Sequence, residues 1–150
     1  MKYFGIPLIG CMIMMSCAGQ RPVNLGVING RLTDCPSKPN CVGSQATDED
    51  HAVAPFLYEG SKQSAFQRLK KAIASLERTT VIQENEDYLR MECKSAIMGF
   101  VDDVEFYLPD ENVIHVRSAS RLGYSDLGVN RKRVEQLRKL FAAESIDGRK

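Results

Sequence analysis

Residues 88–118 read YLRMECKSAIMGFVDDVEFYLPDENVIHVRS, and this stretch decides the fold. Apolar and polar side chains alternate in three of its runs, at 88–95, 101–108 and 113–118. Such alternation predicts strands that each bury one face. Residues 109–112 predict a turn, because proline fixes φ and Asp and Asn tolerate turn geometry. Short connections between strands require antiparallel pairing, so the stretch predicts an antiparallel sheet with one packed face.

Helical periodicity appears on both sides of these strands. Ser61 is suited to cap a helix that runs to about Glu77, with apolar residues at helical spacing. Residues 79–84 are rich in β-branched side chains and predict one more strand. The last helix is expected to begin at Asn130, a favourable N-cap residue. The order predicts an α+β protein: a curved antiparallel sheet of four to five strands with two helices packed on one face.

The start of the chain has the pattern of an export signal. Lys2 supplies a positive charge, and the apolar run after it is too short for a transmembrane helix. The run ends at Ser16 and Cys17, and a small residue before cysteine is typical of a bacterial lipoprotein signal. We therefore expect a signal peptide at 1–16 and lipidation, with palmitate, of Cys17. Residues 8–11, which end at Cys11, match the lipoprotein box better but would leave an apolar run of only a few residues. Ordinary cleavage near Ala18 is the other alternative.

Lipidation would divide the rest of the chain into a tether and a folded part. We expect a tether at 17–29, a single α+β domain at 30–145 and a short tail at 146–150. A lipid on the first mature residue anchors a protein to a membrane without spanning it. The expected location is the cell envelope, on a membrane that faces the periplasm or the exterior.

Export also affects the interpretation of the cysteines. Cys35 and Cys41 flank a turn-rich segment, and an oxidising compartment favours a disulfide between them. Closing so short a loop stabilises a fold by about 2–3 kcal/mol in the chain-entropy model. A metal site that includes His51 is the rival interpretation, but the spacing does not match the familiar zinc pairs. We expect no metal, and we expect Cys93 to be a small buried residue.

The alternate positions of the predicted sheet carry charged side chains. Asp103, Glu105, His115 and Arg117 share this polar face, where cross-strand neighbours are close enough to pair. One interpretation is a solvated face of ion pairs that each contribute little to stability. The other is the wall of a polar groove, where carboxylates and His115 would perform acid–base chemistry of a hydrolase type. We favour internal pairing.

Arginines gather around the expected start of the last helix. They are Arg117, Arg121, Arg131 and Arg133. A helix N-terminus attracts anions, and the guanidinium fork binds carboxylate or phosphate with two hydrogen bonds. The alternative is that nearby acidic residues neutralise the arginines internally. The candidate anion-binding residues are Arg117, Ser118, Ser120, Arg121, Asp126, Asn130 and Arg131.

Composition and motifs argue against several functions. The formal net charge is +1, so no strong field draws the whole molecule to nucleic acid. Tyr124 is the only aromatic residue in the basic loop, which also argues against binding of single strands. The sequence contains no P-loop, HExxH, GxGxxG or nucleophile elbow. We expect neither a cofactor nor a nucleic-acid partner.

Several strings of residues resemble a known family. They are NLGV at 24–27, GRL at 30–32, CP at 35–36, PNCV at 39–42, FVDDVEF at 100–106 and VRSASRLGYSDLGVNR at 116–131. Together they resemble the domain-of-unknown-function 1499 (DUF1499) family over most of the mature chain. Gly43 is a departure, because the family pattern commonly has serine there. Members of the family are often exported or membrane-anchored, so the resemblance implies a compartment and no particular reaction.

These observations lead to one main expectation and two alternatives. We expect a membrane-anchored, non-catalytic envelope protein that binds a small anion or an acidic protein partner through its Arg-rich loop. The first alternative is a hydrolase-like enzyme that uses the acidic and histidine side chains of the polar sheet face. The second is a structural scaffold without a ligand.

Overall fold

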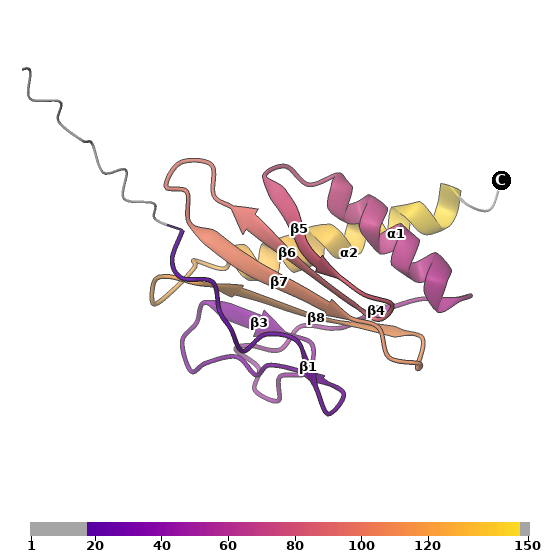
Figure 1. The fold of residues 1–150 in the computed structure, drawn as a ribbon, viewed down its shortest axis with the longest axis horizontal. Coiled ribbons are helices and arrows are strands. Elements are labelled where there is room, and N and C mark those ends of the chain that lie inside the picture. The colour runs from indigo at the N-terminus through magenta and orange to yellow at the C-terminus, as the bar shows by residue number, and fades with distance from the viewer. Residues whose placement is uncertain (1–17, 148–150) are drawn as a thin grey trace, which may run out of the picture.

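The computed structural model describes residues 18–147, and Figure 1 shows their arrangement. The predicted signal peptide at 1–16 and the predicted lipidation site at Cys17 lie outside the described residues. No helix within the described range is long and apolar enough to cross a bilayer. The elements in chain order are β1 (Val27–Ile28), β2 (Arg31–Leu32), β3 (Cys41–Gly43), β4 (Phe56–Leu57), α1 (Lys62–Ala74), β5 (Thr79–Glu84), β6 (Tyr88–Lys94), β7 (Val101–Tyr107), β8 (Val113–Ser120) and α2 (Val129–Asp147).

A six-stranded sheet forms the centre of the protein. Its strand order is β3-β8-β7-β6-β5, and β4 also pairs with β8. All pairs between these named strands are antiparallel, as the short connections predict. The α+β class is confirmed, but the expected four to five strands in a simple curved sheet are corrected to six, with β1 and β2 forming a separate ribbon. Strands of two or three residues are too short to show alternation in a sequence.

One face of the sheet is apolar and carries both helices. Leu89 pairs with Phe106 across β6 and β7, and Phe106 pairs with Val116 across β7 and β8. These residues form a single buried core with Leu69 of α1 and Leu137 of α2. The prediction that both helices cover the same face is therefore confirmed, and Figure 1 shows α2 passing behind the strands with α1 next to it.

The two helices begin in different ways. The Ser61 side chain accepts a hydrogen bond from the Ser64 backbone nitrogen at 3.1 Å, so the predicted cap of α1 is confirmed. The helix ends at Ala74, three residues before the expected Glu77.

The expected cap of α2 at Asn130 is wrong, because the helix begins one residue earlier, at Val129. The Asp126 carboxylate accepts from the backbone nitrogens of Gly128 and Asn130, at 3.0 and 2.7 Å. Positive φ angles of 54° at Leu127 and 78° at Gly128 turn the chain back and bring Asp126 to this position. The Asn130 side chain is thereby free to point into the protein, where it is fully buried.

The opposite face of the sheet is covered by residues 18–34, which we call the strap. The Gly26 backbone nitrogen donates to Glu105 Oε1 at 2.8 Å, and Arg21 pairs with Glu92 at 2.7 Å. Leu32 of β2 is buried. The indigo segment in Figure 1 follows this path across the strands. Residues 18–29, which the sequence suggests as a tether, thus lie on the domain in the structure.

Candidate functional site

Buried ion pairs occupy the polar face of the sheet beneath the strap. Asp103 is 1% exposed and accepts hydrogen bonds from Arg90 Nη2 and Arg121 Nε, each at 2.7 Å. Arg121 also pairs with Glu92, and Glu92 forms a second ion pair with Arg21 of the strap. Strand register explains the arrangement, because Glu92 and Asp103 are cross-strand partners on the same face of β6 and β7.

A second buried carboxylate lies two residues along β7. Glu105 is fully buried and pairs with Arg117 at 3.3 Å. Its Oε1 atom accepts from the Tyr88 hydroxyl at 2.9 Å and from the backbone of Gly26 at 2.8 Å. The face is therefore internally paired, as we favoured, but it is not solvated. Burial makes these interactions more consequential than surface ion pairs.

Burial and hydrogen bonding on this face shift the pKa values of Asp103, Arg121 and Tyr88. Burial alone would raise the pKa of Asp103, but hydrogen bonds from Arg121 and Arg90 outweigh that effect and lower it below 3.8. Hydrogen bonding to Asp103 likewise raises the pKa of Arg121. Burial raises the pKa of Tyr88, and the nearby Glu105 charge adds to the effect. At neutral pH these side chains form fixed charges and donors rather than proton donors for general acid catalysis.

His115 lies apart from the two carboxylates. It is opposite Tyr107 in the sheet, its ring stacks on that side chain, and Ser44 Oγ lies 3.2 Å from its Nδ1. Burial lowers the pKa of His115. Among residues 18–147, no hydrogen bond or ion pair joins His115 to Asp103 or Glu105. The structure thus does not assemble these three candidates into one site.

A different polar cluster lies on the helix side of the sheet. Ser118 Oγ donates to Asn130 Oδ1 at 2.6 Å, while Asn130 Nδ2 donates to Ser120 Oγ at 2.9 Å. Asn130 Nδ2 also donates to the Asn40 backbone carbonyl at 3.1 Å, which ties α2 to the loop before β3. Arg133 pairs with Asp102 at 2.6 Å. The side chain of Asp102 points to the helices, as strand alternation predicts.

The residues of the Arg-rich loop are therefore divided between two faces. Ser118, Ser120, Asp126 and Asn130 come together on the helix side, whereas Arg117 and Arg121 lie beneath the strap. Alternation along β8 causes the division, because successive side chains point to opposite faces.

Arg131 has a third position. Its guanidinium donates to the backbone carbonyls of Ala52 and Asp50, at 2.7 and 2.8 Å, and so fastens the loop before β4 to the start of α2.

A pocket of about 530 Å³ lies between the strap and the polar face, and we call it the strap pocket. Arg117, Arg121, Lys38 and Asn40 contribute to its wall. Arg117 Nε and Asn40 Oδ1 are both covered, and neither has a hydrogen-bond partner among residues 18–147. Buried polar atoms are usually paired, so two such atoms on residues that line one pocket are unusual. Of the residues in this part of the protein, Arg21, Asn40 and Tyr88 did not emerge from the sequence as candidates.

The predicted disulfide between Cys35 and Cys41 is present, with an S–S distance of 2.00 Å. Cys35 lies in the wall of the strap pocket. The bond removes both thiols from the rival metal site, and His51 pairs with Asp48 at 2.6 Å. Cys93 is buried in the core, as expected, and burial raises the pKa of its thiol to about 11.

A protein-family model matches the part of the chain from β2 into α2. The family is described as a protein of unknown function, DUF1499, and its model matches residues 31–141. The chain belongs to the DUF1499 family. The matched region contains the polar sheet face, the helix-side cluster and the disulfide, and the resemblance inferred from short strings is confirmed.

One curated relative has a name that places it in a lumen. The chain is 30% identical over 99 residues to the "Thylakoid lumenal 17.9 kDa protein, chloroplastic" of Arabidopsis thaliana. The match covers 63% of this DUF1499 chain and 44% of that protein. The chain therefore spans less than half the length of the relative.

Proposed function

We propose that this DUF1499 protein is an exported envelope protein, held at a membrane by a lipid on Cys17, that binds a small organic anion in the strap pocket. Three observations support export. They are the signal-like run at 1–16, the disulfide between Cys35 and Cys41, and the lumenal name of the relative.

The observation that carries the binding proposal is the pair of unpartnered polar atoms in the pocket wall. A buried donor or acceptor without a partner costs about 1–3 kcal/mol. Arg117 Nε is a donor and Asn40 Oδ1 is an acceptor. A ligand with a carboxylate or phosphate oxygen and a hydroxyl group would satisfy both. Because both atoms are covered, a ligand would reach them only after neighbouring side chains move.

The charge balance of the pocket floor favours an anion. The charged residues that line the pocket are Lys38, Arg117 and Arg121 against Asp34 and Asp103, an excess of one positive charge. The ion pairs beneath it have the same excess, with Arg21, Arg90, Arg117 and Arg121 against Glu92, Asp103 and Glu105. The volume of about 530 Å³ lies within the range of small-molecule sites, which is about 300–1,000 Å³.

The same geometry makes an acidic protein partner a weaker proposal. The Arg117 and Arg121 side chains are only 9% and 5% exposed, so a protein surface would not reach them without removal of the strap. The hydrolase alternative has no comparable support, because His115 is separated from the carboxylates and these are held by arginines.

The binding proposal is tested by thermal unfolding of the full chain in detergent micelles, followed by circular dichroism because the chain has no Trp. The panel contains phosphate, sulfate, acetate and hydroxycarboxylates such as lactate and citrate. We expect a hydroxycarboxylate to stabilise the protein, by about 2.7 kcal/mol at one hundred times its dissociation constant. If no anion in the panel stabilises the protein, the binding proposal is wrong.

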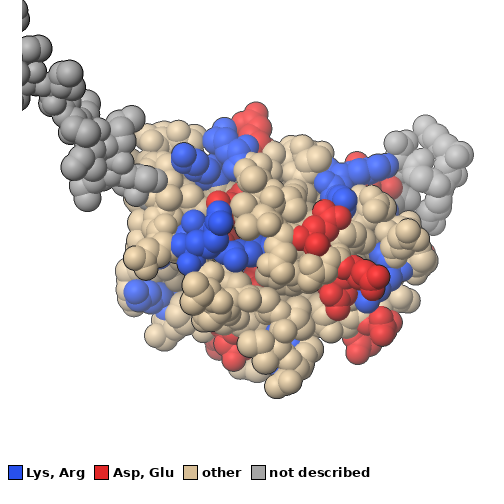
Figure 2. Space-filling view, viewed as in Figure 1, with Lys and Arg blue, Asp and Glu red and all other residues tan. Residues whose placement is uncertain are grey.

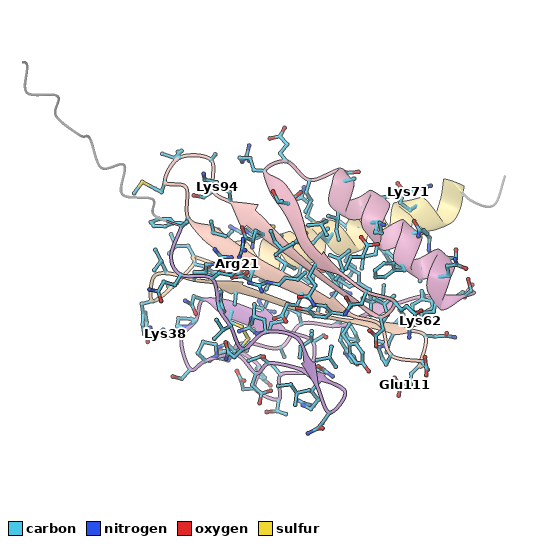
Figure 3. The ribbon with its side chains drawn as sticks, in the orientation of Figure 1. Arg21, Lys38, Lys62, Lys71, Lys94 and Glu111 are labelled. Carbon is cyan, nitrogen blue, oxygen red and sulfur yellow. A yellow bond between two sulfur atoms is a disulfide. The ribbon has the colours of Figure 1, made fainter. Side chains whose placement is uncertain are left out.

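Three variants localise the effect. Ala119 lies in the pocket wall, so Ala119→Val should fill space and abolish the stabilisation by ligand. Lys38→Gln at the rim should weaken it, whereas Lys71→Gln on α1 should not change it. Figure 3 shows Lys38 beside the strap and Lys71 on the distant helix. Unchanged stabilisation in Ala119→Val would place the ligand elsewhere.

The anchor is tested separately by cell fractionation. Cys17→Ala should release the protein from the membrane fraction, because the thiol that receives the lipid is removed. Continued retention of this variant in the membrane fraction would refute lipidation at Cys17 and would leave the ligand experiment unaffected.

A further inference from the structure

Two neighbouring loops expose large apolar side chains at one end of the sheet. Ile97 is 93% exposed, Leu127 is 86% exposed and Tyr124 is 71% exposed. We call this surface the loop end. Its apolar members are Ile97, Met98 and Phe100 between β6 and β7, Leu122, Tyr124 and Leu127 between β8 and α2, and Val129 at the start of α2.

The two loops form one continuous surface. Phe100, Leu122 and Val129 line a shared groove of about 180 Å³, which joins the β6–β7 loop to the start of α2. Figure 1 shows both loops at the same end of the molecule. Single exposed apolar side chains are common on proteins, but a contiguous group of them marks an interaction surface.

The N-terminal part of the chain meets the domain at this surface. Gly19 lies against Arg121 and Leu122 so closely that an added Cβ would be 3.0 Å from the Cγ of Leu122. Figure 1 shows the described chain starting beside the two loops. Cys17, the proposed lipid-bearing residue, is two positions before Gly19. A lipid on Cys17 would therefore hold the loop end close to the bilayer.

Charges around the loop end suit an anionic surface. Figure 2 shows Lys and Arg side chains concentrated on the half of this face next to the N-terminal segment, and most of the acidic side chains on the other half. Figure 3 places Lys94 and Lys38 on the first half and Glu111 at the far end. Lysines near a bilayer are attracted to anionic headgroups, and exposed apolar and aromatic side chains enter the interfacial layer.

We propose that the loop end docks on an anionic lipid surface, with Ile97, Tyr124 and Leu127 in the interfacial layer and Lys94 among the headgroups. The inference rests on the membrane location in the proposed function and adds an orientation to it. A domain on a flexible lipid tether would sample all orientations. Docking of the loop end instead sets the sheet at a fixed angle to the bilayer and keeps the distant edge, with Leu57 and Glu111, in the aqueous phase.

The absence of Trp makes the orientation measurable, because one introduced Trp is the only such fluorophore in the chain. The full chain is purified from membranes and reconstituted into vesicles of phosphatidylcholine and phosphatidylglycerol that contain brominated acyl chains. Ile97→Trp and Leu127→Trp place the reporter in the two loops of the loop end. Leu57→Trp is the matched control, because Leu57 is also an exposed apolar residue, at 76%, but belongs to β4.

We expect a blue-shifted emission and several-fold stronger quenching by bromine for the two loop-end reporters than for Leu57→Trp. Replacing phosphatidylglycerol with phosphatidylcholine should reduce the quenching, because the lysines lose their anionic partners. A Tyr124→Trp reporter should also lose its quenching when Ile97→Ser and Leu127→Ser are added.

Two results would overturn the docking proposal. Quenching that is equal at the loop end and at Leu57 would show that the tethered domain has no preferred face. A blue shift that is present without lipid and insensitive to bromine would show that protein covers the loop end, either a second copy or the segment before residue 18. Both results are independent of the Cys17→Ala fractionation, which tests the anchor alone.

Discussion

Asp103 is the position where the buried ion pairs under the strap are tested most directly. Replacing it by asparagine keeps the shape of the side chain and removes its charge. Arg90 and Arg121 would then share a neutral amide, whose nitrogen is itself a donor. Because the Arg90 and Arg121 side chains are 9% and 5% exposed, water does not replace the lost carboxylate.

The expected cost follows from what remains after the substitution. Breaking a buried ion pair by removing one partner destabilises a protein by about 3–5 kcal/mol, because the other charge stays buried. Asp103 serves two arginines, which increases the cost, but Glu92 remains as a partner of Arg121. We therefore expect Asp103→Asn to lower the free energy of unfolding at pH 7 by about 3–5 kcal/mol.

Urea denaturation monitored by circular dichroism measures this difference. The control is Asp110→Asn, because Asp110 pairs with Lys62 but its side chain is 98% exposed. A surface pair of this kind contributes about 0–1 kcal/mol, so the control should unfold near the wild-type midpoint. A cost below about 1 kcal/mol for Asp103→Asn would refute the reasoning, because it would give the buried network the value of a surface pair.

The pH dependence of the difference in unfolding free energy between wild type and Asp103→Asn provides a second test. The pKa of Asp103 is lower in the native state than its ordinary value of 3.8. Its stabilising effect is therefore complete above pH 3.8 and is lost as the pH falls through the depressed native pKa. The difference between wild type and Asp103→Asn should be constant from neutral pH down toward this value and should narrow only in stronger acid.

Four further changes have defined outcomes in the same denaturation assay. Replacing Cys35 and Cys41 by serine should lower the free energy of unfolding by about 2–3 kcal/mol, the loop-closure value, and reductant should have this effect on the wild type only. Asn130→Ala should cost about 1–3 kcal/mol, because it leaves buried donors and acceptors unpaired. Burial lowers the pKa of His115, so stability should fall as the pH decreases through 6.5, and His115→Gln should remove this loss. A hydrogen bond to the Lys38 carbonyl and pairing with Asp48 raise the pKa of His51. The stability that His51 contributes is therefore present below pH 6.5 and is lost as the pH rises through its native pKa. His51→Gln should remove this trend, which is opposite to that of His115.

The part of the fold that could be predicted is the part that repeats a pattern along the chain. Strands β5 to β8 contain six to eight residues each, which is long enough for alternation to show both the strand and its buried face. Ser61 precedes a helical apolar stripe and was a clear cap. The short spacing between Cys35 and Cys41 was sufficient to predict the disulfide, because the signal-like start of the chain indicated an oxidising compartment.

The strap and its pocket could not be predicted in this way. Strands β1 and β2 are two residues each, and the pairing of Arg21 with Glu92 joins residues that are 71 positions apart. Alternating charges look the same in a sequence whether water or protein covers them. Nothing local indicated that Glu105 would be fully buried.

The start of α2 shows a competition between two suitable residues. Asp126 and Asn130 are both favourable capping types, and the Asn130 prediction ignored the chain reversal at Leu127 and Gly128. Glycine after a short polar residue was the available signal, because glycine adopts positive φ without strain. Once Asp126 takes the cap, Asn130 becomes the buried link between α2 and the loop before β3.

The path of the strap also sets an order of events in folding. Hairpins between β6, β7 and β8 close short loops, whereas Gly26 and Glu105 are 79 positions apart in the sequence. The entropy of loop closure makes such distant contacts slow to form, and they have no template until the hairpins exist. The strap precedes the long strands in the sequence but is thus expected to be among the last segments to dock. Before the strap docks, water can reach the ion pairs on β6 and β7, so we expect salt and acid to weaken these pairs more at that stage than in the folded protein.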